Sequence, residues 1–126
     1  MARYTDFEDQ KKNVKETWSS MALLLEKFDW KFFTEEAAIQ VEAYEILDDA
    51  FDFADDSADF VKLVSYEIDK LEEKIKLQRK VGSKTDADDS NAILKYLVKY
   101  VHFNFPEDLW KEYPEFDNNH YVWGCR

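Results

Sequence analysis

The sequence predicts an all-α fold: a small helical bundle of about four helices, followed by a short C-terminal helix and an aromatic tail. Three observations predict it. The first glycine or proline in the 126 residues is Gly82, so a long stretch carries no helix breaker. Apolar residues recur at intervals of three or four, which is the helical period. The length suits one core, and we expect residues 1–126 to form a single helical domain.

The first helix is predicted to begin at Thr5, because Thr5 and Glu8 have the spacing of a capping box. Its apolar positions are Phe7, Val14, Trp18, Met21, Leu25 and Phe28. A corner at residues 29–33 follows, and Thr34 is the predicted N-cap of a second helix that runs to about Ala54. The apolar side of that helix is Ile39, Ala43, Ile46, Leu47, Ala50, Phe51 and Ala54.

The sequence leaves open whether this second helix continues through residues 55–57 or whether a third helix starts there. The third helical stretch carries Phe60, Val64, Ile68, Leu71 and Ile75 on one face. We expect it to end near Val81, with Gly82 as a left-handed C-cap.

Residues 83–89 are predicted to form a polar loop, after which Asp89 or Ser90 caps a fourth helix. The apolar face of that helix is Ile93, Leu94, Leu97, Val98 and Val101. Pro106 is expected to open a short helix through Tyr113, which Pro114 ends.

Composition narrows the function classes. A single cysteine, Cys125, excludes a disulfide within the chain. The longest apolar run, Met21–Leu25, is far shorter than a membrane span, and the acidic N-terminus is not typical of a secretory signal, so we expect a cytoplasmic protein. The net charge of −11 disfavours direct binding to nucleic acid or to an anionic membrane, and it favours a basic partner.

The charge is concentrated in one segment. Residues 32–61 hold ten acids and neither Lys nor Arg, whereas the rest of the chain holds eighteen acids and seventeen bases. On a continuous helix, eight of the acids would share an arc of roughly 140° and a length of about 25 Å. They are Glu42, Glu45, Asp48, Asp49, Asp52, Asp55, Asp56 and Asp59. Like charges at this spacing destabilise a helix, so the segment calls for an explanation.

Three interpretations compete for the acidic segment. It can be a solvated face that keeps the protein in solution, or it can be neutralised internally by the basic stretch Lys70–Lys84. It can also be a docking face for a basic partner. In that third case a row of carboxylates resembles the phosphates of a DNA strand, so an acidic helix can occupy the nucleic-acid groove of another protein.

Signals for catalysis are weak. Two glycines cannot build a phosphate-binding loop, and His102 and His120 are the only histidines. We expect no metal and no cofactor, since structural zinc needs four ligands. One enzymatic alternative is a metal-dependent nucleotide pyrophosphohydrolase-like helical enzyme. Its carboxylate spacing would be supplied by Glu42-x-x-Glu45 and Glu45-x-x-Asp48.

The favoured hypothesis is a non-enzymatic protein–protein interaction module. In its concrete form it is an acidic, DNA-mimic-like inhibitor, of a viral anti-defence or immunity type, that binds a basic surface of a nucleic-acid-handling protein. The eight acids would supply steering, and Trp110, Tyr121 and Trp123 would supply aromatic anchors. The C-terminal aromatics can equally cap the bundle. A second alternative is a structural subunit that self-associates through that aromatic surface; the oligomeric state is left open.

Overall fold

The computed structural model describes residues 6–27 and 35–117. Four long helices occupy most of this part: α1 (Phe7–Lys27), α2 (Glu35–Phe53), α3 (Ser57–Lys80) and α4 (Lys84–Asn104). A one-turn helix, α5 (Glu107–Trp110), and a 3-10 turn, η2 (Pro114–Phe116), follow. The predicted all-α bundle is therefore confirmed, with no strand among the described residues.

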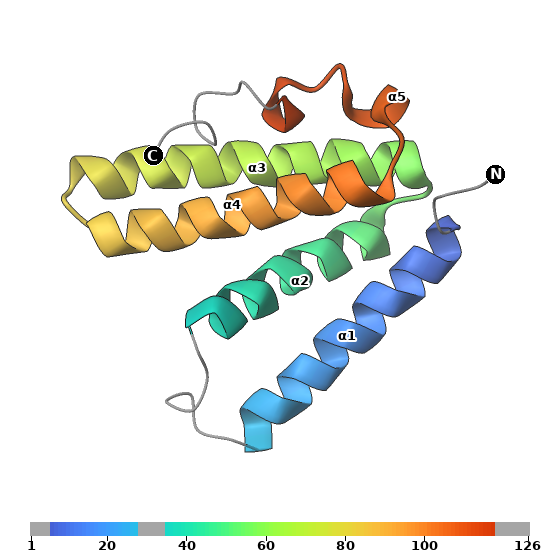
Figure 1. The fold of residues 1–126 in the computed structure, drawn as a ribbon, viewed down its shortest axis with the longest axis horizontal. Coiled ribbons are helices and arrows are strands. Elements are labelled where there is room, and N and C mark those ends of the chain that lie inside the picture. Colours follow the sequence, from blue (N-terminus) through green and yellow to red (C-terminus); the bar gives the residue numbers. More distant parts are fainter. Residues whose placement is uncertain (1–5, 28–34, 118–126) are drawn as a thin grey trace.

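The long helices form two antiparallel pairs (Figure 1). α3 and α4 lie side by side as a hairpin, and α1 pairs with α2, which packs on both α4 and α3. α5 and η2 pack on the α3–α4 hairpin. None of the described helices is both long enough and apolar enough to cross a membrane.

The core lies between α2, α3 and α4, and aromatic rings fill its centre. Phe51 of α2 stacks on Phe60 of α3 with ring centroids 3.9 Å apart and an interplanar angle of 19°. Phe105 lies 5.3 Å from Phe60, and Phe7 of α1 reaches Phe51 at 5.4 Å. Aliphatic side chains extend this core along the helices: Leu47, Val61, Val64, Ile68, Ile75, Leu94, Leu97, Val98 and Val101.

The helix is interrupted between α2 and α3. The second predicted helix therefore does not continue through residues 55–57, and a third helix starts there. α2 ends at Phe53, and Asp56 has an extended backbone at the N-cap of α3. The Asp56 carboxylate accepts a hydrogen bond from the Asp59 backbone N–H at 2.8 Å, while the Asp59 carboxylate accepts one from the Asp55 N–H at 3.0 Å. These short polar side chains cap a helix start at the expense of continuing the preceding helix.

The predicted loop at residues 83–89 is wrong, and so is the cap at Asp89 or Ser90. α4 begins at Lys84, with Ser83 at its N-cap. The turn closes early because Gly82 has a positive φ of 84°. Ser83 N–H then donates to the Gln78 carbonyl at 2.8 Å, and Gly82 N–H to the Arg79 carbonyl at 3.2 Å.

Small residues allow the first turns of α4 to pack on α3, and this explains why the sequence interpretation placed the helix start too late. Ala87 and Ser90 are buried, and they extend the buried face of α4 from Ile93 toward its N-terminus by more than one turn. The Ser90 hydroxyl donates to Gln78 Oε1 of α3 at 3.0 Å. A larger apolar residue at position 87 would have revealed the helical period; alanine did not.

The C-terminal helix is shorter than predicted. α5 ends at Trp110 rather than at Tyr113, and Pro114 opens η2 rather than ending a helix. Proline has no backbone N–H but fits the first turn of a helix, so it serves at this start. The predictions for Thr5, residues 29–33, Thr34, Phe28, Tyr121 and Trp123 lie outside the described residues.

Candidate functional site

The acids of the predicted stripe divide into two groups, because α2 and α3 are separate helices. Asp56 and Asp59 cap α3. The row along α2 runs from Glu42 to Asp52 and spans about 15 Å rather than the 25 Å of a continuous helix. Glu42, Glu45, Asp49, Asp52, Asp55 and Asp56 are exposed, and we call these six residues the acidic face.

Asp48 does not belong to this exposed group. It is 7% exposed and lies against α1, where Lys15 Nζ is 3.2 Å from its Oδ1. The same ammonium lies 3.2 Å from Asp52 Oδ1. Hydrogen bonds to Asp52 and Asp48 raise the pKa of Lys15. This ion-paired group joins α1 to α2 and stabilises the otherwise repulsive C-terminal half of α2.

The basic stretch Lys70–Lys84 lies away from Asp55, Asp56 and Asp59, the acids at the corner between α2 and α3. α3 runs from the α2–α3 corner to the opposite end of the bundle (Figure 1). Lys70 to Lys80 therefore lie about 20–36 Å along its axis from Asp56. Within α3 itself, Lys70 pairs with Glu67 and Lys76 pairs with Glu73. Lys15 supplies the positive charge beside Asp48 and Asp52 of α2.

A small groove opens between α2 and α3 beside the acidic face. It has a volume of about 100 Å³ and is lined by Ile46, Asp49, Ala50, Phe53, Leu63 and Glu67; we call it the corner groove. Phe53 is 79% exposed, which is unusual for a ring on a core-forming helix. Burial raises the pKa of Asp49, and the negative charge of Asp48 raises it further. Asp52 and Glu67 raise it further, so negative potential accumulates at the groove.

The carboxylates of Asp48, Asp49 and Asp52 have oxygens within 4.8 Å of one another. Two of the three are already paired with Lys15, which partly neutralises the cluster. Glu42 and Glu45, the other members of the pyrophosphohydrolase-like spacing, are exposed on the acidic face. Within the described residues, this spacing does not bring carboxylates from two helices around one position, as a metal cage requires.

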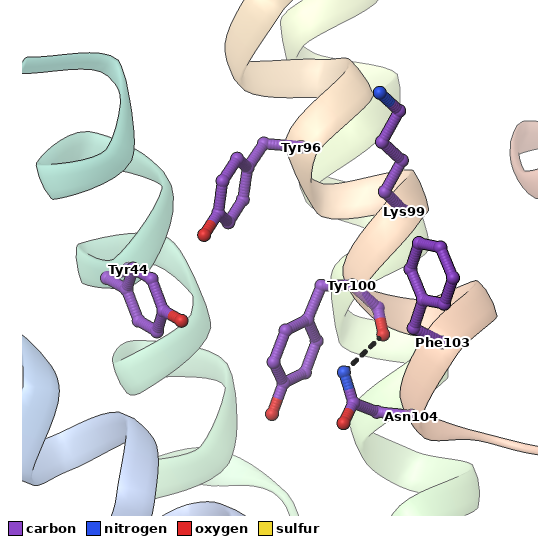
Figure 2. A pocket seen from close by; sticks show the side chains of 6 residues that line it. All are labelled: Tyr44, Tyr96, Lys99, Tyr100, Phe103 and Asn104. Atoms are coloured by element: carbon purple, nitrogen blue, oxygen red, sulfur yellow. Dashed lines mark hydrogen bonds between the residues drawn. The ribbon is translucent and has the colours of Figure 1, made fainter. Parts of the chain in front are cut away.

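A second, larger hollow lies between α2 and α4, and the sequence interpretation missed it. Its volume is about 430 Å³, and Tyr44, Tyr96, Lys99, Tyr100, Phe103 and Asn104 line it (Figure 2); we call it the tyrosine pocket. Tyr44 and Tyr96 have ring centroids 5.9 Å apart and tilted by 60°. The i, i+4 spacing of Tyr96 and Tyr100 was the available signal, but only the approach of α2 adds Tyr44.

A smaller hollow of about 130 Å³ shares Tyr44, Tyr100 and Asn104 with the tyrosine pocket and reaches the polar side chains of α1. Asn104 anchors this side. Its Nδ2 donates to the Tyr100 carbonyl at 2.9 Å, and its own carbonyl accepts from Gln10 Nε2 at 3.1 Å. The end of α4 is thereby fixed to α1.

Trp110, a predicted anchor, is half-buried and held within the fold. Its ring stacks on His102, with centroids 4.1 Å apart and an angle of 19°, and its Nε1 donates to the Phe105 carbonyl at 3.1 Å. His102 Nε2 in turn donates to the Phe116 carbonyl at 2.6 Å. Phe105, Trp110 and Phe116 therefore pack on the bundle, whereas Phe103 is exposed.

No known protein family, curated protein or solved structure matches the chain.

Proposed function

We propose that this protein is a non-enzymatic binding module whose acidic face docks on a basic surface of a nucleic-acid-handling protein, as an inhibitor that occupies the place of a phosphate backbone. The observation that carries the proposal is the corner groove, where the exposed ring of Phe53 shares the lining with the carboxylates of Asp49 and Glu67, the second of which is paired with Lys70. A solvated face needs neither feature. Exposed Phe53 adds no solubility, and an acidic surface without a ring would serve that purpose better.

The charge of the face supports an electrostatic encounter. A net charge of −11 with its densest part on one helix creates a potential that attracts basic surfaces and raises association rates. Carboxylates three or four residues apart on a helix lie about 5–6 Å from one another, a spacing of the same order as that of backbone phosphates. The row on α2 is short, so the surface it covers on a partner corresponds to a few nucleotides.

The corner groove suits one long basic side chain of the partner. The aliphatic stem of a Lys or Arg would pack on Phe53, Ile46 and Leu63, and its charged head would reach Asp49 and Glu67 at the rim. Arg gains more, because its planar guanidinium also stacks on an aromatic ring. Glu67 is already paired with Lys70 at 3.2 Å on the solvent side, and an incoming Arg would compete with that exposed lysine.

The acids that hold the fold together must be kept apart from those that are free to bind. Asp48 pairs with Lys15, while Asp56 and Asp59 cap α3. A variant that removes these side chains would lose stability as well as charge. Glu42, Glu45, Asp49 and Asp55 are exposed and carry neither role, so they are the residues through which the docking proposal is tested.

The test compares two four-amide variants of equal charge. The face variant carries Glu42→Gln, Glu45→Gln, Asp49→Asn and Asp55→Asn. The control variant carries Glu8→Gln, Glu16→Gln, Asp88→Asn and Glu112→Gln, which are exposed residues elsewhere. Partners captured from a host lysate are quantified at about 50 mM and 500 mM salt, where screening is weak and strong respectively. Their association rates are then measured.

We expect the face variant to associate about tenfold more slowly than the control variant at low salt. We expect Phe53→Ala to accelerate dissociation with little effect on the salt dependence. If the two four-amide variants lose association equally, the protein's overall charge is responsible and the acidic face is not an interface. If Phe53→Ala changes nothing, the corner groove does not receive a partner side chain.

A further inference from the structure

The tyrosine pocket lies on the opposite side of α2 from the corner groove, and docking at the acidic face makes no use of it. Its volume of about 430 Å³ falls within the range of roughly 300–1,000 Å³ that is common for small-molecule sites. Four of its six lining residues are aromatic, and Figure 2 shows Tyr96 and Tyr100 extending from α4 toward Tyr44 of α2.

The charge of this pocket is the reverse of the charge of the protein. Its lining contains no carboxylate, and its one charged residue is Lys99. The chain as a whole has twenty-eight acids and a net charge of −11. A pocket whose only formal charge is positive, on such a protein, favours an anionic group on its ligand. Lys99 also disfavours a cation, although rings of this kind otherwise attract one.

The polar groups of the pocket are hydrogen-bond donors as well. Burial raises the pKa of Tyr96 to about 12, and a hydrogen bond with the Tyr44 side chain contributes to this rise. Burial also raises the pKa of Tyr100 above its ordinary value. Both phenols therefore keep their protons at physiological pH. The Tyr96 hydroxyl already shares a hydrogen bond with Tyr44, so the Tyr100 hydroxyl is the one that can donate to an acceptor oxygen of a ligand. A carboxylate is acceptor-only and matches such a lining.

The walls are held in place before a ligand arrives. The Tyr100 ring packs edge-on against Phe51 and Phe60, with centroids 6.5 Å and 6.3 Å away, so the core fixes it. Asn104 is fixed by its bonds to Tyr100 and Gln10. Phe103, by contrast, is 79% exposed at the edge of the pocket. A flat ligand ring that covered it would bury apolar surface at little ordering cost.

We infer that the tyrosine pocket binds an aromatic monoanion of the arylacetate class, with its flat ring between Phe103 and the tyrosines and its carboxylate toward Lys99 and a phenol hydroxyl. This site is independent of the acidic face, and its test does not depend on whether the docking proposal holds.

Three probes that share a 2-naphthyl ring and differ in the charge of the head group test the inference. They are 2-naphthylacetate, 2-naphthylethanol and (2-naphthylmethyl)trimethylammonium, titrated into the full chain by calorimetry and by amide NMR. We expect the carboxylate to bind about two- to fivefold more tightly than the alcohol, the range for one exposed charge contact, and the ammonium to bind most weakly. Shifts should concentrate at residues 96–104.

Variants separate the contribution of the Lys99 charge to ligand binding from that of the Phe103 ring. Lys99→Gln should weaken the carboxylate about two- to fivefold and leave the alcohol unchanged. Phe103→Ala should weaken both about two- to tenfold through the lost ring contact. Phe53 is also 79% exposed and lies at the other site, so Phe53→Ala is the matched control and should change neither. Both phenylalanines are surface residues, and thermal melts of both variants verify that the fold is intact.

Three results would overturn the inference. The ammonium probe could bind best, which would make the pocket a cation cage. Phe53→Ala could weaken binding as much as Phe103→Ala, which would make the binding unspecific adsorption to exposed rings. Finally, all three probes could fail to show saturable binding up to about 10 mM, a concentration that detects even a Kd in the millimolar range.

Discussion

The two corners at the ends of α3 are built in different ways. The α2–α3 corner is closed by side chains: the carboxylates of Asp56 and Asp59 accept backbone hydrogen bonds, and the stacked rings of Phe51 and Phe60 lie beneath them. The α3–α4 corner is closed by the backbone, through Gly82 and the carbonyls of the last turn of α3. Negative charge at the first corner is thus partly structural, and at the second corner it plays no part in the turn.

This difference limits what the acidic segment can be taken to mean. Of the eight acids that the sequence places on one face, four are used by the fold, namely Asp48, Asp52, Asp56 and Asp59. Removing all eight would confuse a loss of stability with a loss of binding. Substitutions at the first corner report on side-chain packing and capping, whereas a substitution at Gly82 reports on backbone strain.

The largest effect is expected beneath the side-chain-built corner. Phe60→Ala removes a fully buried ring that stacks on Phe51 at 3.9 Å. We expect it to lower the free energy of unfolding by about 3–5 kcal/mol, since it combines lost burial with a cavity. Chemical denaturation followed by circular dichroism measures this. A loss below about 1 kcal/mol would mean that the two rings do not form the centre of the core.

At the backbone-built corner, Gly82→Ala isolates conformational strain. A Cβ added at Gly82 would meet nothing within 4 Å, so the substitution creates no clash. The positive φ of 84° remains costly for alanine, and we expect a loss of about 1–2 kcal/mol. Gly82→Asn should recover part of this loss, because asparagine tolerates the left-handed region better. Equal stability of Gly82→Ala and the wild type would contradict the turn geometry.

Asp56→Ala tests the cap at the first corner. It removes the acceptor of the Asp59 N–H, which lies 2.8 Å away, and typical capping losses are about 1 kcal/mol. Asp56→Ser should retain most of the stability, because a hydroxyl also caps, although its charge is gone. If Asp56→Ser is as unstable as Asp56→Ala, the negative charge matters there and the cap alone does not explain the residue.

The smallest effect concerns the middle of α3, between the corners. Burial raises the pKa of Glu115 in η2 to about 7, and Asp69 and Glu72 of α3 face it and contribute. Its ordinary value is 4.5, so between these values the folded protein holds a proton that the unfolded chain has lost. The stability from this group is therefore present at low pH and is lost as pH rises through about 7.

Glu115→Gln should remove this dependence while leaving both corners intact. Compared with the wild type, it should raise Tm by about 1–2 °C at pH 8 and by a smaller amount at pH 5, where only part of the stability has been lost; the effect is small because solvent screens a partly exposed carboxyl. Paired thermal melts at the two pH values measure the difference. A Tm difference that is the same at both pH values would mean that Glu115 does not titrate in this range.

The sequence alone predicted the helical class, the end of α3 near Val81, and most of the core. The period of Phe60, Val64, Ile68 and Ile75 places them on one buried face regardless of what covers it. It also determined that negative charge concentrates in α2. Local signals of this kind depend on residues a few positions apart, and a helix makes those positions neighbours.

The contacts of each charged or aromatic side chain depend on how the helices pack. Lys15 neutralises Asp48 because α1 lies against α2, and no spacing in the sequence relates positions 15 and 48. The tyrosine pocket exists because α2 brings Tyr44 to Tyr96 and Tyr100 of α4. Pairings between distant segments depend on how helices pack, which is decided by the fit of whole faces. Residue types alone therefore predicted the helices of this protein, but its corner groove and tyrosine pocket required the packed bundle.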